Sequence, residues 1–536
     1  MPKPHVLLLL FATVLFGWLV YSFVNVDFWN DEIYTLKAFT FVPLHTTLTD
    51  YHAPNNHVFL NLVDNLYLRL LGINTLKQLM QTPYKLRCLM VFYALLTAIY
   101  LYLFVRAVSN KNTAALAIVI LLSTMPYCNF FWEVRGYGLS TLFNAAILYH
   151  GYHFSEQLRW KNAIALLFCV SLCIYTLPTN LYLMIAWLGF IFLQLVCTQF
   201  YLYYTQKRAN LAFTNNIFVR LGQNTGLIIP SNVFKNALFL LLCLVIGTIL
   251  GFAFYTPMLA AMFGNKYAVG GNMAYNWHSL DALAYSLLHF ASWRYGLYLL
   301  WLIAILTFFR QIKSKNNQLS TSNNTLHHQT IPYIWLTAYL FVMPFVIDAL
   351  LNKAAPWRVF VPLAPFYSAT LALSIGYLLK QIPIFRQHLS LNYVAIGLYC
   401  IAAWAMCWVA VRQQLQHDLL HNGRNQDLNV QYYQHYYEPL KELRLLSNHR
   451  KTSPVPVLLI DAEPHDISDY LTQINIPFYD AAKQDSLLQN TQQLYVVLRY
   501  KPTFAQQIHE KYPNWQFSFL SADTLRYPKV AFGEKK

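Results

Sequence analysis

The sequence is short of charge. Only 11% of its 536 residues are Asp, Glu, Lys or Arg, whereas a soluble domain carries about 25%. It also has no Cys-x-x-Cys pair, no glycine-rich phosphate loop and no dinucleotide fingerprint. These absences argue against a water-soluble chain, a zinc site built on paired cysteines and nucleotide binding through one of those loops.

What the chain has instead is long apolar runs. Hydrophobic residues make up 57% of it, and they fall into blocks of about 15–23 residues, the length that a bilayer core requires. About eleven such blocks are predicted to span a membrane: Val6–Val24, Cys88–Val105, Ala114–Phe131, Tyr137–Phe154, Ala163–Pro178, Leu181–Tyr203, Ala237–Tyr255, Ser292–Phe309, Ile334–Leu351, Val359–Leu379 and Tyr393–Val411. All eight cysteines lie in these blocks, so no disulfide framework is expected outside them.

Three of these assignments need a further argument. The stretch 163–203 is too long for one span, and Pro178-Thr179-Asn180 supplies the turn that divides it. The block Ser292–Phe309 is short and begins beside Arg294. The first block is interpreted as an uncleaved helix rather than a signal peptide, because no small-x-small cleavage site follows it.

The charges that are present follow one topology. With the N-terminus inside, the inner segments hold Lys and Arg but a single acid, Glu156, while the outer segments hold the other acids of the membrane region. This is the distribution that the positive-inside rule requires. It accounts for the formal net charge of +16 without a nucleic-acid partner, and it predicts an integral, multi-pass protein of the inner (plasma) membrane.

The expected fold is an all-α polytopic membrane domain followed by a small soluble α/β domain. Residues 1–411 form the membrane domain, 412–436 connect, and 437–536 form the second domain on the outer, periplasmic side. Within the outer segment 25–85, Asp31–Phe41 and Asn56–Leu71 show apolar residues at helical spacing and are predicted to be interfacial helices.

The C-terminal domain shows strand-like and helix-like runs in alternation. Val455–Ile460, Leu494–Leu498 and Trp515–Leu520 are predicted strands, with Ile467–Thr472 and Phe504–Lys511 as helices between them. This alternation predicts a small, mainly parallel sheet.

Chemistry is expected on the outer side, beginning with Asp27, Asp31 and Glu32 after the first span. A carboxylate there can act as a general base toward a hydroxyl or amine, and a group of oxygen ligands can hold a divalent cation. The alternative is structural, with Asn30 or Asp31 capping a helix and the acids in its first turn. Asp27, Asp31 and His52 are the candidate metal ligands, and whether a metal is used stays open.

Other polar groups occur on the same side. His52 and His57 flank Ala-Pro-Asn-Asn, and Glu133-Val-Arg135-Gly-Tyr137 follows the third span. A single cation at a membrane edge usually anchors the helix, whereas several that converge can bind an anionic phosphate. The candidate substrate-binding residues are Arg135, Arg358, His57, Tyr137, Lys266, Lys353 and Trp357.

Four short motifs give the chain a family resemblance. Asn30-Asp31-Glu32-Ile-Tyr resembles the Asp-Glu-x-Tyr motif of the lipid-linked glycosyltransferases with the GT-C fold, and the segment from His52 to His57 resembles their His-Pro-Pro-Leu helix start. Glu133-Val-Arg-Gly-Tyr137 is similar to their Ala-Arg-x-Tyr motif, and Trp357-Arg-Val-Phe-Val-Pro362 to their Glu-Arg-Tyr-x-x-Pro run. In style the chain is closest to the protein O-mannosyltransferases and the lipid A aminoarabinose transferases.

The resemblance implies an inverting transferase that takes a sugar from a polyprenyl phosphate at the outer membrane face. Asp31 would be the base, Glu32 its catalytic neighbour, and Arg135 and Arg358 would hold the leaving phosphate, with His52 and His57 shaping the site or assisting a cation. The acceptor would be a glycan, a lipid or a protein. The chain departs from the family at Asn55-Asn56 and at Ala355-Pro356-Trp357, which leaves the acceptor and the phosphate contacts open.

Two other functions remain possible from the sequence. A transporter or flippase of a lipid-linked sugar would need polar groups near the middle of its spans, but Asp348 is the only acid within a predicted span and it lies close to the outer end. A non-catalytic receptor or scaffold would leave the outer acids and cations unexplained.

Overall fold

The computed structural model describes residues 3–28, 30–53, 56–207, 229, 231–264, 325–351, 357–381, 389–415, 439–452, 455–460, 467–468, 471–472, 474–480, 491–498, 512–520 and 529–536. By compactness, the chain divides into two units. The first unit comprises Met1–Val20, Leu48–Leu60 and Leu89–Trp408. The second unit comprises Tyr21–Thr47, Asn61–Cys88 and Val409–Lys536.

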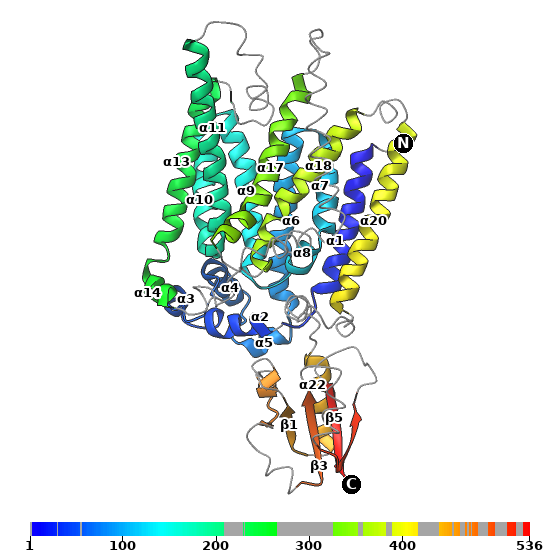
Figure 1. Cartoon of the computed structure of the whole chain (residues 1–536). Coiled ribbons are helices and arrows are strands. Elements are labelled where there is room, and N and C mark those ends of the chain that lie inside the picture. The colour runs from blue at the N-terminus through cyan, green and yellow to red at the C-terminus, as the bar shows by residue number, and fades with distance from the viewer. Residues whose placement is uncertain are drawn as a thin grey trace. The chain divides into compact units, whose positions relative to one another are not determined.

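Long helices dominate the first unit (Figure 1). They are α1 (Pro4–Phe23), α6 (Tyr84–Val108), α7 (Lys111–Ser123), α9 (Gly136–Glu156), α10 (Trp160–Thr176), α11 (Leu181–Lys207), α13 (Ser231–Ala253), α17 (Thr325–Leu350), α18 (Ala364–Gln381) and α20 (Leu389–Leu415). Among the described residues, 6 helices are long and apolar enough to cross a membrane, and further apolar helices are shorter. Each predicted span overlaps at least one described helix except Ser292–Phe309, which lies outside the described residues.

The apolar side chains of these helices are divided between interior and surface. Residues 136–148 of α9 are all buried, whereas Leu10, Phe168 and Ile249 on other helices are more than half exposed. Large apolar side chains exposed on long apolar helices are what a lipid environment requires. We conclude that the chain is an integral, multi-pass membrane protein.

The first and last predicted spans pack against each other. The Trp404 ring of α20 lies 6.4 Å from the ring of Phe11 and 4.9 Å from that of Trp18, both on α1. Figure 1 shows these two helices side by side, α1 in blue and α20 in yellow.

The third predicted span is two helices rather than one. Helix α7 ends at Ser123, Thr124 is extended (φ −78°, ψ 118°), and α8 (Met125–Phe130) begins again with Pro126 in its first turn. Proline is accepted there because the first N–H groups of a helix have no partner within the helix. The prediction of one continuous helix over Ala114–Phe131 was therefore wrong at its C-terminal end, where the chain turns toward Arg135.

The segment after the first span is helical, as its apolar spacing predicted. It forms α2 (Asn30–Thr35), a π-helix η1 (Leu36–Thr40), α3 (Leu44–Thr49), α4 (Val58–Leu70) and α5 (Leu76–Met80). Helix α5 begins with a capping box, in which Thr75 accepts from the backbone N–H of Gln78 and the Gln78 side chain reaches back to Thr75.

A helix and a mixed sheet make up the described C-terminal part of the second unit. After α22 (Pro439–Thr452) come β1 (Val457–Ile460), β2 (Tyr479–Asp480), β3 (Gln493–Leu498), β4 (Trp515–Phe519) and β5 (Lys529–Lys535), in the spatial order β2-β1-β3-β5-β4. Strand β1 pairs in parallel with β2 and β3, but β5 pairs antiparallel with β3 and β4.

The prediction of a mainly parallel sheet was therefore wrong. Strand β5 lies between β3 and β4. It has lysines and an acid at its ends, so its sequence lacks the long apolar run that would have predicted a strand. Of the predicted helices, residues 467–468 and 471–472 are helical. Phe504–Lys511 lies outside the described residues.

Candidate active site

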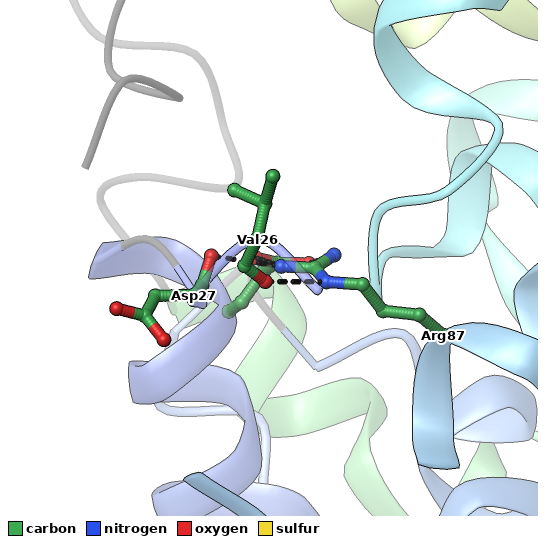
Figure 2. A network of polar contacts seen from close by, with 4 residues as sticks. Val26, Asp27 and Arg87 are labelled. Atoms are coloured by element: carbon green, nitrogen blue, oxygen red, sulfur yellow. Dashed lines mark hydrogen bonds and ion pairs between the residues drawn. The ribbon is translucent and has the colours of Figure 1, made fainter. Parts of the chain in front are cut away.

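The acidic loop after the first span is held by Arg87, from the first turn of α6. The two guanidinium nitrogens Nη1 and Nη2 each lie 3.1 Å from a carboxylate oxygen of Glu32. Arg87 Nε donates to the carbonyl of Val26 at 2.8 Å, and Nη2 donates to that of Asp27 at 2.9 Å. Figure 2 shows the guanidinium against these carbonyls, with the Asp27 carboxylate pointing away from it. The arginine thus fixes the backbone at which α2 begins.

This ion pair is fully buried. Neither the Arg87 nor the Glu32 side chain is exposed, and the guanidinium carbon lies 4.8 Å from the centre of the Phe28 ring. A fork-to-fork pair of this kind adds geometric specificity as well as energy. Glu32 therefore acts as a structural anchor for α2, while its neighbour Asp31 is half-buried in the first turn of the same helix.

In the first unit, His57 lies among residues from three distant segments. It comes directly before α4, and only 2% of it is exposed. The rings of His57 and Tyr137 meet edge-on, with centres 5.7 Å apart. A Cβ atom on Gly136 would lie 2.5 Å from His57 Nδ1, so glycine is needed where α9 starts. The Arg135 guanidinium carbon lies 5.9 Å from the Tyr137 ring centre.

The electrostatics around His57 show that two arginines lie near it. Burial lowers the pKa of the His57 imidazole well below its usual range, and the charges of Arg135 and Arg358 lower it further. A backbone contact at Thr176 acts weakly in the opposite direction. His57 is therefore a neutral imidazole in a positively charged surrounding. The motifs around residues 57, 135 and 358 converge, which the sequence could not show.

Further polar groups are buried in the same unit. Glu133 has no exposed surface and Arg135 has 2%. Both polar atoms of the Asn129 side chain, on α8, are buried and have no hydrogen-bond partner among the described residues. Buried polar groups usually have a partner in the protein, in water or in a ligand. The Asn129 amide is therefore available to water or to a polar ligand.

Several predicted residues are placed elsewhere or not described. His52 is exposed, and its Nδ1 lies 2.7 Å from Asp50 Oδ1. Lys266 and Lys353 lie outside the described residues, and so does the side chain of Trp357. Within the described part of the chain, no three His, Cys, Asp or Glu side chains group so that they could hold a metal ion. The cation site at Asp27, Asp31 and His52 thus gains no support from the geometry.

Two residues of interest were missed from the sequence. Arg87 was not singled out, although it stands in the first turn of a helix, where the dipole disfavours a cation. That conflict is the signal that could have identified it. Asp64 was taken as part of an interfacial helix, yet none of it is exposed. No pattern in the neighbouring sequence marks it as buried.

Asp64 gives a first prediction. Its carboxylate oxygens have no hydrogen-bond partner in the described structure, and burial raises the pKa of the Asp64 carboxyl well above its usual range. Below the ordinary aspartate pKa of about 3.9, the stability that protonated Asp64 contributes to the folded state is fully present. This stability is lost as pH rises through the raised pKa of the folded state. We expect Asp64→Asn to raise the thermal unfolding midpoint by a few degrees at pH 8, and by less toward pH 4. Asp50→Asn, at a half-buried acid, should give no such gain, and a midpoint lowered by Asp64→Asn at pH 8 would show that the carboxylate has a stabilising role.

No protein-family model and no curated protein matches this sequence. Matches were found among solved structures. The chain is similar to GT-C lipid-linked glycosyltransferases. One match is ArnT from Cupriavidus metallidurans bound to undecaprenyl phosphate, at 11% identity and TM-score 0.49, over 98% of this chain and 97% of that one. Another is the archaeal oligosaccharyltransferase AglB from Archaeoglobus fulgidus in complex with an inhibitory peptide and a dolichol-phosphate, at 13% identity and TM-score 0.43, over 99% of this chain and 74% of that one.

Proposed function

We propose that the protein is a membrane glycosyltransferase that moves a sugar from a polyprenyl-phosphate donor to an acceptor on the outer face of the membrane, with inversion. The observation that carries the proposal is the convergence of Arg135 and Arg358 on the buried, neutral His57. Arginine is well suited to bind phosphate because its planar guanidinium matches the geometry of the phosphate oxygens.

The position of Arg135 strengthens this assignment. It occupies the N-cap position of α9, which has 21 residues, and makes no capping bond with its side chain. The N-terminal end of a helix carries partial positive charge and free N–H groups, so it attracts anions. A guanidinium and a helix N-terminus side by side repel each other, but both favour a phosphate bound between them.

A lipid-linked donor follows from the surroundings of this site. The helices are long and apolar, and a polyprenyl tail is stable only in lipid, whereas its phosphate needs cations at the interface. A nucleotide sugar would require a nucleotide site, and the sequence contains no nucleotide fingerprint. The energy for transfer would come from the bond between the sugar and the lipid phosphate.

We assign to individual residues the roles that the family resemblance implies. Asp31 takes the proton of the acceptor hydroxyl or amine, and that oxygen or nitrogen attacks the anomeric carbon while the carbon–oxygen bond to phosphate breaks. Direct displacement inverts the anomeric centre. Glu32 and Arg87 hold α2 in position. Lys266, Lys353 and Trp357 remain proposed contacts of the donor, and a divalent cation remains an open requirement.

The phosphate assignment predicts a binding defect. Arg358 is half-buried, and removing one charge-assisted hydrogen bond costs about 1.5–3 kcal/mol. We expect Arg358→Gln to weaken donor binding about 10- to 100-fold, measured as KM for a polyprenyl-phosphate sugar. Arg69→Gln, at an exposed arginine in the last turn of α4, should leave KM within about 2-fold because a solvated cation contributes little. Equal KM values for the two variants would remove Arg358 from the phosphate site.

The topology predicts which side the C-terminal domain faces. Ser518 on β4 is exposed, so a Ser518→Cys variant in a background without the native cysteines offers one reactive thiol. We expect a membrane-impermeant maleimide to label it in intact spheroplasts. Labelling that occurs only after the spheroplasts are lysed would place the domain inside and contradict the proposed topology.

A further inference from the structure

Two cysteines from distant parts of the chain meet inside the first unit. Cys128 lies on α8 and Cys407 on α20, and their sulfur atoms are 4.0 Å apart. Neither residue has any exposed surface. Both thiols donate to one acceptor, the backbone carbonyl of Leu122, at 2.6 Å from Cys128 and 3.3 Å from Cys407. The two side chains therefore point toward each other at the break between α7 and α8.

Proline at position 126 explains why this carbonyl is open to a side chain. In a continuous α-helix, the carbonyl of Leu122 would accept a hydrogen bond from the backbone N–H of residue 126. Pro126 has no N–H, so the carbonyl is left for other donors, and the thiols supply them. A hydroxyl would donate more strongly than a thiol, so the carbonyl alone does not require cysteine at both positions. What two cysteines in contact add is the capacity to form a covalent bond.

Aromatic contacts with α1 hold both cysteine-bearing segments in this arrangement. Trp404 lies about one turn before Cys407, and its ring centre is 4.9 Å from that of Trp18 on α1. Phe131, directly after α8, packs against Phe16 of α1 with ring centres 5.9 Å apart. A bond between the sulfurs then requires them to approach by about 2 Å, which is the scale of a side-chain rotation and not of a helix shift.

We propose that Cys128 and Cys407 are oxidised to a disulfide that joins α8 to α20 when the protein is assembled. The proposed topology puts the C-terminal end of α20 on the outer side, together with the turn that leads from α8 to Arg135. Disulfides form and persist in the oxidising environment outside the cytosol. The inference rests on this part of the proposed function and not on sugar transfer.

The oxidant would be the disulfide of a thiol oxidoreductase on the outer side. The Cys128 thiolate attacks that disulfide and forms a mixed disulfide, and the Cys407 thiolate then displaces the oxidant. Each cysteine loses one proton, and the two electrons reduce the disulfide of the oxidant to two thiols. Because both sulfurs are buried in the folded protein, the exchange precedes the packing of α20, and the finished bond is shielded from external reductants.

The test is whether a disulfide joins two fragments of the protein. A recognition site for a specific protease is inserted between α11 and α13, so that cleavage puts Cys128 and Cys407 on separate fragments. Membranes are isolated with N-ethylmaleimide, cleaved, and dissolved in SDS that contains the same reagent, which blocks free thiols. We expect the fragments to migrate together without reductant and to separate once dithiothreitol is added. Fragments that separate without reductant overturn the inference.

Serine variants identify the pair. Cys128→Ser and Cys407→Ser keep a donor for the Leu122 carbonyl, and each should release the fragments without reductant. Cys400→Ser is the matched control at a half-buried cysteine of α20, and its fragments should stay joined. Fragments that stay joined in Cys128→Ser or Cys407→Ser, or that separate in Cys400→Ser, would assign the bond to another pair and overturn the inference.

Mass spectrometry of the wild type keeps the inference testable if a variant does not fold. We expect a peptide that contains residue 128 to be linked to one that contains residue 407. Finding both peptides only in the alkylated form contradicts the inference. None of these measurements depends on sugar transfer, and the topology is measured separately by the labelling of Ser518→Cys, so a failure here is distinguishable from a failure of the proposed function.

Discussion

Replacing Asp31 by Asn should reduce sugar transfer by about 10²- to 10⁴-fold, the range of general base catalysis. Asparagine has the same shape but cannot take a proton from the acceptor. Donor binding should change little, because the phosphate contacts proposed here come from Arg135 and Arg358. The measurement is the single-turnover rate of a polyprenyl-phosphate sugar with saturating acceptor, together with the dissociation constant of the donor.

Asp27→Asn is the matched control for this experiment. Asp27 belongs to the same loop and is also half-buried, but its backbone carbonyl, not its carboxylate, is the group that binds Arg87. Its variant should keep transfer within about 10-fold of wild type, as expected for a carboxylate outside the proton transfer. If Asp31→Asn turns over like the wild type, Asp31 is not the base.

Replacing Arg87 by Met should destabilise the protein by about 3–5 kcal/mol, because the variant leaves a buried Glu32 carboxylate without its cation. The carbonyls of Val26 and Asp27 also lose their donor. Transfer should fall in the fraction that stays folded, since α2 carries Asp31. Thermal unfolding in detergent and the specific activity of the folded fraction measure the two effects separately.

A double variant separates the contribution of charge from the rest of the interaction between Glu32 and Arg87. Glu32→Gln combined with Arg87→Met removes both charges, so it should recover part of the stability that Arg87→Met alone loses. Recovery will be incomplete because the two backbone carbonyls remain without a donor. A double variant that is less stable than the wild type by the full sum of the two single-variant losses would mean that Glu32 and Arg87 do not interact.

The spanning helices were predictable because a bilayer imposes length and apolarity together. The positions at which these helices end were less predictable. A run of apolar residues does not distinguish one helix from two, and Pro126 ends α7 inside such a run. Likewise β5 was missed because the charged residues Lys529, Glu534 and Lys535 at its ends leave only a short apolar run between them.

The candidate site was predictable as a set of residues but not as an arrangement. Sequence placed Arg135 and Arg358 on one side of the membrane, whereas their approach to His57 depends on where α9 and η5 begin. Glu32 was predicted to be catalytic with Asp31, because both acids belong to the segment that resembles the Asp-Glu-x-Tyr motif. Glu32 is fully buried and is bound by two guanidinium nitrogens of Arg87, whereas Asp31 is half-buried. Neither property can be seen in the sequence alone.

The central claim is that the protein breaks the bond between a sugar and a polyprenyl phosphate, and one measurement tests it most directly. Purified wild-type protein in proteoliposomes is given a pool of radiolabelled polyprenyl-phosphate sugars and candidate acceptors, and the lipid products are separated. We predict that free polyprenyl phosphate accumulates and that the label appears on an acceptor with inverted anomeric configuration. Intact donor that crosses the bilayer without cleavage would contradict this account and identify the protein as a transporter of lipid-linked sugars.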